Sequence, residues 1–248
     1  MKLSGAVALV TGANRGLGAA FVEALVARGA RIYAGARDPE TIPASGGAVT
    51  PLRLDVTDPA SIAAVAEAAP DVTLLINNAG LLEQRGVVEA GDLDPFRREM
   101  EVNVFGVAAM SLAFAPVIAG QGGGAIVNVL SNASIVPFPC FGSYSATKAA
   151  AMSLTHTMRH ELADRAIAVH GVYAGFIDTG MVDNVDAAKT GPDAIVAAAL
   201  DGVEAGMLDI ATDAPSRKSR VLMHGALSDV LTASYERATG FRRTHPAQ

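Results

Sequence analysis

The sequence has one cysteine, no tryptophan, few aromatic residues and no excess of basic residues. The single thiol, Cys140, excludes an intramolecular disulfide and fits a reducing compartment. A formal net charge of −6 argues against a nucleic-acid partner, because such a partner binds a basic face. Every apolar run is broken by a glycine, proline or polar residue before it reaches membrane length, and the N-terminus shows no signal-peptide pattern. We therefore expect a cytoplasmic protein without a membrane or nucleic-acid partner.

Apolar residues are plentiful, and 50% of the 248 residues are hydrophobic. One α/β domain of this length can bury a large core. We predict that this domain covers 1–240 and that 241–248 form a frayed basic tail. Short apolar runs predict strands at 6–10, 31–36, 50–56, 72–76, 125–130, 167–173 and 208–211. Helical patterns lie at 19–28, 60–69, 93–119, 192–205, 216–227 and 228–238.

A glycine-rich turn, Thr11–Gly18, lies between the first predicted strand and the first predicted helix. This context is the one in which such a motif binds a dinucleotide. Gly12 permits a tight turn, Gly16 lets the backbone approach a pyrophosphate, and Gly18 lets the helix pack against the strand. The helix N-terminus then offers N–H groups and a positive dipole end to the phosphates. A glycine-rich loop that binds nothing is the alternative.

The end of the second predicted strand indicates which dinucleotide is bound. An acidic residue there would hold a bare ribose, but the chain has Ala36 and Arg37. Arg15 lies inside the glycine-rich turn, and two guanidinium groups can hold a 2′-phosphate. Asp38 is the contrary signal, but it precedes Pro39 and fits a turn. The pattern therefore predicts NADP(H).

Polar or small residues stand at the ends of later elements. Asp55, near the end of the third predicted strand, could accept a hydrogen bond from an adenine amino group or act as a plain cap. The small residues of Asn77–Gly80 would let the middle of the cofactor approach closely. Asn103 interrupts an apolar stretch of the long helix, where a buried amide needs a partner. It could kink the helix around a water or be a packing amide.

The segment Ser143–Lys148 carries the main chemical signal. Tyr144 and Lys148 are four residues apart, so they share one face of a helix, and the residues that follow favour a helix. A nearby ammonium lowers the pKa of a phenol, and a phenol tuned in this way can exchange a proton with a substrate oxygen. Ser131 ends a predicted strand, at the edge where open α/β sheets bind ligands. Alone, such a Tyr and Lys pair is more often structural.

Together these motifs resemble the classical short-chain dehydrogenase/reductase family, over about Leu3 to Thr179. The resemblance implies a Rossmann fold, a doubly wound parallel sheet of about seven strands in a single α/β domain. It implies that Tyr144 is the acid/base, that Ser131 polarises the carbonyl, and that Lys148 lowers the pKa of Tyr144 and holds the nicotinamide ribose. Asn103 would hold a water that links Lys148 to solvent.

The catalytic set implied by the resemblance is Asn103, Ser131, Tyr144 and Lys148. The expected cofactor contacts are Gly12, Asn14, Arg15, Gly16, Leu17, Gly18, Arg37, Asp55, Val56, Asn78, Ala79, Gly80, Tyr144, Lys148, Gly175, Phe176 and Thr179. The sequence departs from the family at Ala174, where proline is usual, so a looser turn is expected there. The segment 39–48 has room for one helical turn at most, which leaves the outer wall of the adenosine pocket undefined.

These observations predict an NADP(H)-dependent carbonyl reductase or alcohol dehydrogenase acting on a ketone, aldehyde or secondary alcohol. Phe138, Phe141 and Met181 indicate an apolar pocket and hence an apolar or aromatic substrate. The alternatives are a non-catalytic NADP(H)-binding regulatory protein and an epimerase or dehydratase that retains its cofactor. A homodimer or homotetramer is expected. No metal is expected, because His156 and His160 lack a third ligand, and a surface or subunit-contact role fits them better.

Overall fold

The computed structural model describes residues 1–42, 47–84, 86–183 and 185–221. Within these residues the strands form one parallel sheet of seven strands in the order β3-β2-β1-β4-β5-β6-β7. The predicted helix at 228–238 and the tail at 241–248 lie outside the described residues. The strands are β1 (Val7–Thr11), β2 (Arg31–Ala36), β3 (Val49–Arg53), β4 (Leu74–Asn77), β5 (Gly124–Val129), β6 (Ile167–Tyr173) and β7 (Asp209–Ala211).

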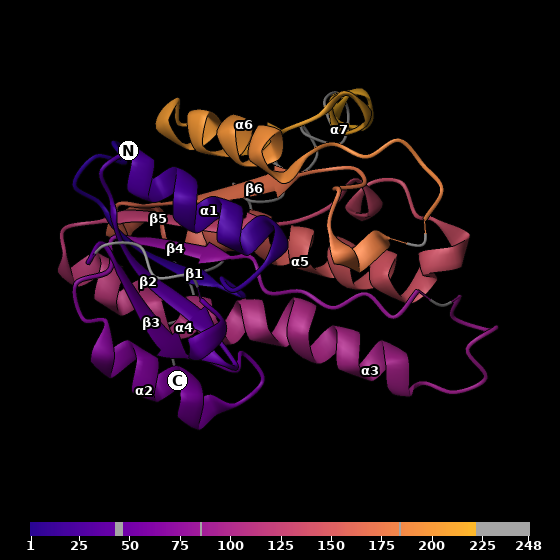
Figure 1. Ribbon diagram of the computed structural model, residues 1–248, viewed down its shortest axis with the longest axis horizontal. Helices are drawn as coiled ribbons and strands as arrows, with labels where there is room; N and C mark the ends of the chain where they lie inside the picture. Colours follow the sequence, from indigo (N-terminus) through magenta and orange to yellow (C-terminus); the bar gives the residue numbers. More distant parts are fainter. Residues whose placement is uncertain (43–46, 85, 184, 222–248) are drawn as a thin grey trace, which may run out of the picture.

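Helices cover both faces of the sheet, which confirms the predicted doubly wound α/β fold (Figure 1). One face carries α1 (Gly16–Ala27), α6 (Pro192–Glu204) and α7 (Ala214–Arg220). The other carries α2 (Pro59–Ala68), α3 (Asp94–Met100), α4 (Gly106–Gly120) and α5 (Gly142–Glu161). Each layer has its own apolar core, one packed around Phe21 and Leu200 and the other around Phe114 and Ile126.

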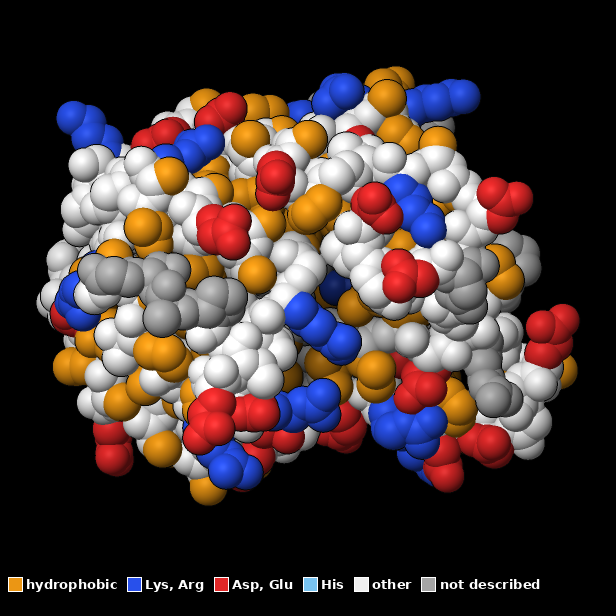
Figure 2. Space-filling model, viewed as in Figure 1, with side chains coloured by type: hydrophobic (Ala, Val, Ile, Leu, Met, Phe, Trp, Pro, Cys, Tyr) orange, Lys and Arg blue, Asp and Glu red, His pale blue; other side chains and the backbone are white. Residues whose placement is uncertain are grey.

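The strand order reverses between β1 and β4, because the chain first builds β1 to β3 outward and then returns to the other side of β1. In open parallel sheets the carboxyl ends of the strands at such a switch point form the ligand-binding crevice. Figure 2 shows the molecule hollowed near the middle of the face drawn in Figure 1, with basic side chains beside the hollow. The fold therefore places the glycine-rich turn, which follows β1, at this point.

The long helix predicted at 93–119 is continuous over Asp94–Gly120 but contains one π-helical segment, η2 (Glu101–Phe105), between α3 and α4. Asn103 lies in this segment and is fully buried. Its Oδ1 accepts from Leu81 N at 2.8 Å, and its Nδ2 donates to Leu81 O at 2.8 Å and to Thr147 Oγ1 at 3.0 Å. The π-helical turn thus directs a polar side chain inward, an arrangement frequent at functional sites.

The same helix is long and apolar enough to cross a membrane, with a mean hydropathy of 2.0 in its most apolar window. Half of that window is buried in the protein, where α4 packs on the sheet through Phe114 and Ile118. A core helix passes the same length and composition test, so this property carries no membrane assignment.

The other predicted elements differ from the structure mainly at their ends. The third strand stops at Arg53, which leaves Asp55 in a loop, because the Asp55 carboxylate closes a turn with Thr57. The segment between β2 and β3 contains one helical turn among its described residues, η1 (Pro39–Thr41).

Candidate active site

The glycine-rich turn wraps closely against two other segments. A Cβ on Gly12, whose φ is +64°, would lie 3.1 Å from Ala79 Cα. A Cβ on Gly16, at φ +53°, would lie 3.3 Å from Thr179 Cγ2. The turn therefore meets the loop after β4 and the segment after β6, and larger residues would fill the space between them. Gly18 is needed for packing, because a Cβ there would lie 2.0 Å from the carbonyl oxygen of Gly12.

The N-terminus of α1 has the properties of an anion site. Its N-cap residue, Arg15, makes no capping hydrogen bond through its side chain, and the first turn holds no acidic residue. The first N–H groups of a helix have no partner within the helix, and they carry the positive end of its dipole. A pyrophosphate would satisfy these donors, so the residues present fit a dinucleotide.

Thr11, to which sequence analysis gave no role, fixes the loop after β4 beside this turn. Its Oγ1 accepts from Asn78 N at 3.0 Å and from Ala79 N at 2.9 Å. Asn78 in turn donates through Nδ2 to Thr11 O at 2.8 Å and to Gly12 O at 3.2 Å. The small residues Asn78, Ala79 and Gly80 are therefore held next to the glycine-rich turn. The position of Thr11, between a buried strand and Gly12, is the signal in the sequence that could have identified it.

Arg15 and Arg37 both have exposed side chains and make no ion pair with the residues that the structure describes. Asp38 turns away from the end of β2 and caps η1, accepting from Glu40 N at 3.2 Å. The assignment of Asp38 to the turn is therefore confirmed. Asn14 is also partly structural, since its Nδ2 donates to Thr41 Oγ1 at 3.1 Å. The end of β2 thus carries a guanidinium group and no carboxylate directed at the site.

In the structure Asp55 caps a turn, which is one of the two roles that the sequence left open. Its Oδ1 accepts from Thr57 N at 2.9 Å and from Thr57 Oγ1 at 2.7 Å. These hydrogen bonds, with a smaller contribution from the charge of Arg37, hold the pKa of Asp55 below its ordinary value. The neighbouring Val56 packs against the start of α4, where a Cβ on Gly106 would meet Val56 Cγ2 at 2.9 Å. One carboxylate oxygen of Asp55 is therefore already used by the protein.

The predicted catalytic groups meet at the carboxyl end of β5. Tyr144 and Lys148 lie on consecutive turns of α5, and Lys148 Nζ is 5.7 Å from the centre of the Tyr144 ring. Lys148 Nζ donates to Val129 O, the last residue of β5, at 2.8 Å. Ser131 accepts from Ala133 N at 3.1 Å and caps the short helix η3 (Asn132–Ser134), and its hydroxyl is near enough to the Tyr144 hydroxyl to lower the pKa of the phenol. The structure thus brings Ser131, Tyr144 and Lys148 together.

The pKa of Tyr144 differs from the expectation. The resemblance implied that this pKa is lowered, but in the structure it is raised. Burial raises the pKa of Tyr144 to about 12; the hydrogen bond from Ser131 lowers it, and the charge of Glu99 raises it further. Burial also lowers the pKa of Lys148 to about 8, and its ammonium donates to the backbone carbonyl of Val129.

Asn103 lies close to Lys148. A Cβ on Gly80 would be 3.4 Å from Asn103 Oδ1 and 3.8 Å from Lys148 Nζ, so both atoms border the same small space. The amide has the partners that a buried Asn requires, in Leu81 and Thr147. The geometry therefore shows the packing role directly, and a water between Asn103 and Lys148 remains an implication of the resemblance.

The segment after β6 is tied down on both sides. Ala174 O accepts from Asn132 N at 2.7 Å, and Gly175 N donates to Asp213 Oδ2 at 2.7 Å. The looser turn expected from the absence of proline is thus held by hydrogen bonds, one of which is accepted by Asp213, a residue that was not predicted. Phe176 packs against Phe138 and Phe141, with ring centres 5.9 Å and 6.1 Å apart.

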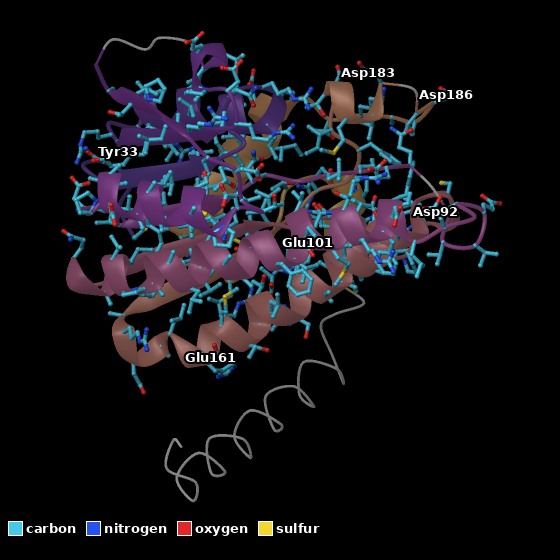
Figure 3. The ribbon with its side chains drawn as sticks, turned by 90° about the horizontal axis from the view of Figure 1, so that it is seen from below. Tyr33, Asp92, Glu101, Glu161, Asp183 and Asp186 are labelled. Carbon is cyan, nitrogen blue, oxygen red and sulfur yellow. The ribbon has the colours of Figure 1, made fainter. Side chains whose placement is uncertain are left out.

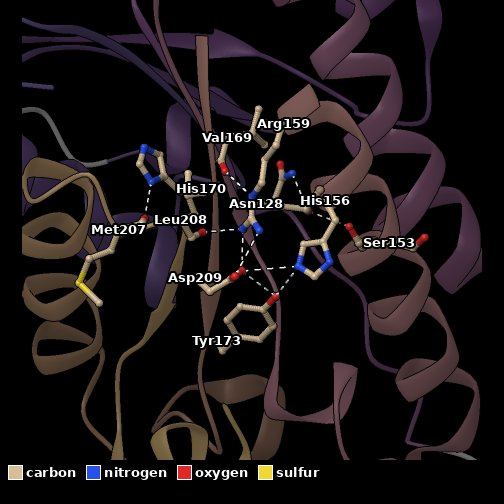
Figure 4. Close-up of polar contacts among 12 residues, drawn as sticks. Asn128, Ser153, His156, Arg159, Val169, His170, Tyr173, Met207, Leu208 and Asp209 are labelled. Carbon is tan, nitrogen blue, oxygen red and sulfur yellow. Dashed lines mark hydrogen bonds and ion pairs between the residues drawn. The ribbon is translucent and has the colours of Figure 1, made fainter. Parts of the chain in front are cut away.

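The two histidines of α5 do not act as a pair. The side chain of His156 is 11% exposed, and its Nε2 lies 3.6 Å from Asp209 Oδ1 and 3.4 Å from the Tyr173 hydroxyl (Figure 4). The surface role expected for this pair is therefore wrong for His156, because β6 and β7 supply polar partners beneath α5, whereas the alternative of a subunit contact stays a prediction. Among the described residues, no cluster of three or more His, Cys, Asp or Glu side chains could hold a metal ion.

Comparison with known proteins agrees with this geometry. Residues 6–190 match the short chain dehydrogenase family. Sorbitol dehydrogenase from Cereibacter sphaeroides is 37% identical over 196 residues, which cover 75% of this chain and 76% of that protein. A short chain dehydrogenase from Burkholderia cenocepacia J2315, solved in complex with NADP, is 41% identical with a TM-score of 0.87, over 94% of this chain and 98% of that one. A short chain dehydrogenase/reductase from Burkholderia phymatum, solved in complex with NAD, is 26% identical with a TM-score of 0.78, over 100% of this chain and 98% of that one. The chain belongs to the short-chain dehydrogenase/reductase family.

Proposed function

We propose that this protein is an NADP(H)-dependent carbonyl reductase or alcohol dehydrogenase. The observation that carries the proposal is the meeting of Ser131, Tyr144 and Lys148 at the carboxyl end of β5, two strands along the sheet from β1 and its glycine-rich turn. The nicotinamide supplies and accepts the hydride when it is bound. The protein's own contribution is to orient the substrate and to move a proton.

The two hydroxyls have complementary roles in carbonyl reduction. Ser131 and Tyr144 both donate to the substrate oxygen, on which negative charge builds as the carbonyl carbon is reduced. The Tyr144 proton then passes to that oxygen, which completes the alcohol. With a pKa raised to about 12, the phenol carries this proton throughout the neutral range. In alcohol oxidation the same group, as phenolate, accepts the proton.

The choice of NADP(H) over NAD(H) rests on Arg15 and Arg37, which are exposed and make no ion pair with described residues. The Burkholderia cenocepacia relative solved with NADP supports this choice, and the more distant relative solved with NAD supports the opposite one. In our proposal the guanidinium groups hold the 2′-phosphate and Lys148 holds the nicotinamide ribose. The turn Gly12–Gly18 and the start of α1 hold the pyrophosphate.

This choice gives a first prediction. The protein should use NADPH with a higher kcat/KM than NADH, because a charge-assisted contact to phosphate contributes about 1.5–3 kcal/mol, and each ~1.4 kcal/mol is tenfold in affinity. Replacing Ala36→Asp together with Arg37→Ala should reverse the preference, since a carboxylate accepts from ribose hydroxyls and repels a phosphate. The preference should also shrink as salt rises. Equal or better use of NADH by the unchanged protein would remove Arg37 from the cofactor site.

We propose an apolar or aromatic carbonyl substrate. The support is the aromatic cluster of Phe138, Phe141 and Phe176. In this cluster Phe176, a predicted cofactor contact, packs against Phe138 and Phe141, which lie just before α5. The relative named sorbitol dehydrogenase suggests polyols instead. The test is a panel of aryl ketones, aliphatic aldehydes and keto sugars with NADPH, followed by loss of NADPH absorbance. Turnover of aryl ketones above keto sugars supports the proposal, and the reverse order contradicts it.

Binding of NADPH without turnover of any carbonyl would contradict the enzyme proposal and favour the non-catalytic regulatory protein. Turnover of a substrate without stoichiometric loss of the cofactor would instead favour the epimerase or dehydratase. We also propose that the protein is cytoplasmic and forms a homodimer or homotetramer. The support for assembly is an exposed apolar stripe on one side of η2 and α4, formed by Phe105 and Leu112, whose exposed fractions are 54% and 80%.

A further inference from the structure

Two long loops leave the carboxyl ends of the strands on either side of β5. The loop after β4 covers 78–93, and the loop after β6 covers 174–191. Because β5 lies between β4 and β6 in the sheet, and Ser131 follows β5, these loops leave the sheet on opposite sides of the proposed catalytic residues. Figure 3 shows Asp92 of the first loop and Asp183 of the second at the same end of the molecule.

A side chain joins the two loops. Gln84, in the loop after β4, donates from Nε2 to the carbonyl oxygen of Met181, in the loop after β6, at 2.9 Å. Neighbouring strands of a sheet are about 4.8 Å apart, so β4 and β6 are separated by about 10 Å. The hydrogen bond therefore closes a ring that starts at β4, passes over the end of β5 and returns to the sheet at β6.

The backbone just before Gln84 is fixed to the long helix that α3, η2 and α4 form. Leu81 exchanges two hydrogen bonds of 2.8 Å with the Asn103 amide, and Glu83 N donates to Glu99 Oε1 at 2.8 Å. Gln84 itself has a φ of +52°, in the left-handed region that residues with a side chain rarely adopt. Such a conformation is unfavourable and persists where surrounding contacts hold it. The chain is thus bent at the residue whose side chain crosses to the other loop.

The loop after β6 is closed at its base. Thr190 N donates to Phe176 O at 2.9 Å, and Met181 lies between these two residues, in the helical turn η6 (Gly180–Val182). Between the two ends of the loop, the backbone–backbone hydrogen bonds of the described residues stay within the loop. The hydrogen bond from Gln84 therefore ties the middle of this loop to another part of the protein.

Both loops also contact the residues that lead into the helix of Tyr144. A Cβ on Gly142, the first residue of α5, would lie 3.1 Å from Val87 Cγ2 of the loop after β4. Phe176, of the loop after β6, packs against Phe141 with ring centres 6.1 Å apart. The loops thus border the same aromatic cluster that supports the proposed substrate.

We propose that Gln84 is a specificity-determining residue. Its hydrogen bond to Met181 O is a strap that holds the two loops together over the substrate and limits the bulk of the ketone or aldehyde that fits. The inference rests on the proposed function. Gln84 is a positioning residue, because it acts through the loops and not on the reacting atoms. A compact carbonyl fits with the strap closed, whereas a bulky one requires the strap to open, so the cost of opening falls on bulky substrates.

The test uses two variants of Gln84. Gln84→Gly removes the side chain and suits the left-handed backbone, and Gln84→Glu keeps the size but carries a carboxylate that accepts and does not donate. kcat/KM with NADPH is measured for acetophenone and for the bulkier benzophenone. The ratio of benzophenone to acetophenone should rise about two- to tenfold in both variants, the factor that corresponds to one lost hydrogen bond. The dissociation constant of NADPH should not change.

Gln121→Gly and Gln121→Glu are the matched controls. Gln121 also donates through Nε2 to a backbone carbonyl, that of Pro70 at 3.2 Å, but it lies before β5, at the opposite end of the sheet. These variants should leave the ratio of the two ketones unchanged.

A second measurement needs no turnover. Hydrogen exchange of the amides of 179–183, followed by mass spectrometry, should be faster in Gln84→Gly and Gln84→Glu and unchanged in the Gln121 variants. Position 84 is 97 residues from Met181, so a faster exchange there reports the strap and not a local effect of the substitution.

Unchanged exchange at 179–183 in both Gln84 variants would overturn the strap. An equal fall of kcat/KM for the two ketones, or a weaker NADPH affinity, would indicate a merely structural role and overturn the limit on bulk. If the unchanged protein turns over no carbonyl, the proposed function fails and the specificity role fails with it, while the exchange measurement still decides whether Gln84 holds the two loops together.

Discussion

At the scale of single residues, the buried ammonium of Lys148 lowers the stability of the folded protein. Its side chain is 5% exposed, and Val129 O is its described hydrogen-bond partner. Burial lowers its pKa to about 8, which means that folding disfavours the ammonium. Since the folded-state pKa lies below the unfolded value, the penalty is complete below about pH 8 and disappears as the pH rises toward about 10.5.

Lys148→Met should therefore be more stable than wild type at about pH 7 and lose most of that advantage at about pH 10. The difference in the free energy of unfolding should change by about 2–3 kcal/mol between the two pH values, at ~1.4 kcal/mol per pKa unit. Urea denaturation at the two pH values measures it. Lys2→Met, at an exposed position, should show no such pH dependence. A difference between wild type and Lys148→Met that stays constant with pH would mean that the ammonium is not desolvated.

The residues proposed to carry the chemistry were found through local motifs together with the resemblance to the family. Tyr144 and Lys148 share a helix and Ser131 follows β5, but the spacing alone left the pair open to a structural role. Thr11 and Asp213 were not predicted, because each binds a residue distant in sequence, Asn78 and Gly175 respectively. The direction of the pKa shift at Tyr144 also failed, since burial is a property of the fold that a four-residue spacing does not contain.

At the scale of elements, a buried polar cluster clamps the edge strand β7 to α5 and β6 (Figure 4). Arg159 Nη2 donates to Asp209 Oδ1 at 2.6 Å and to Leu208 O at 2.6 Å, and the Tyr173 hydroxyl donates to Asp209 Oδ1 at 3.2 Å. Burial alone would raise the pKa of Asp209, but hydrogen bonds from His156 and Arg159 hold that pKa well below its ordinary range. The loop after β7 carries Asp213, so this clamp also supports Gly175.

Asp209→Asn should destabilise the fold by about 3–5 kcal/mol, because it leaves the buried charge of Arg159 without its partner. The depressed pKa means that the Asp209 contribution is present above about pH 4 and is lost as the pH falls further. The difference from wild type should therefore shrink in acid. Chemical denaturation at about pH 7 and about pH 3 measures it, and Arg97→Met, in an exposed pair, should change stability by less than about 1 kcal/mol. A loss below about 1 kcal/mol in Asp209→Asn would contradict the clamp.

The ends of the helices and strands show which local sequence signals are enough to predict where an element begins and ends. The strand at 167–173 has the predicted limits: its mostly apolar run begins after Ala166, which is in the left-handed conformation, and ends before Ala174. The π-helical segment was not predicted, since Glu101–Phe105 has the composition of an ordinary helix. Its cause lies in tertiary contacts, because the Asn103 side chain hydrogen-bonds to the backbone of Leu81 and to the hydroxyl of Thr147 at the same time.

At the scale of the whole molecule, the exposed stripe of Phe105 and Leu112 tests the proposed assembly. These residues are seven apart, so they lie on one side of the helix. Leu112→Glu should place charge in the contact between copies and lower the mass measured by light scattering during gel filtration. Val88→Glu is the matched control, because Val88 is 91% exposed in the segment before α3 and is not part of this stripe. An unchanged mass in Leu112→Glu would contradict an interface at this stripe.

The fold as a whole was predictable, because independent signals agree along the chain. The glycine-rich turn fixes the first βα unit, and the apolar runs fix the other strands. The pairing of β1 with β4, which creates the switch point, cannot be read from any one segment. The resemblance to the family implied only a doubly wound parallel sheet, and the sheet order confirms that fold. The substrate is not predictable in this way, since Phe138, Phe141 and Phe176 meet through packing.

The central claim is that Tyr144 gives the proton in an NADP(H)-dependent carbonyl reduction. Tyr144→Phe removes one oxygen and leaves the ring beside Lys148. The direct measurement is NADPH consumption by Tyr144→Phe with a turned-over ketone, alongside the NADPH dissociation constant. The account predicts a kcat lowered by about 10²–10⁴, the contribution of a lost acid/base, with NADPH affinity nearly unchanged. Turnover close to that of the unchanged protein would contradict it.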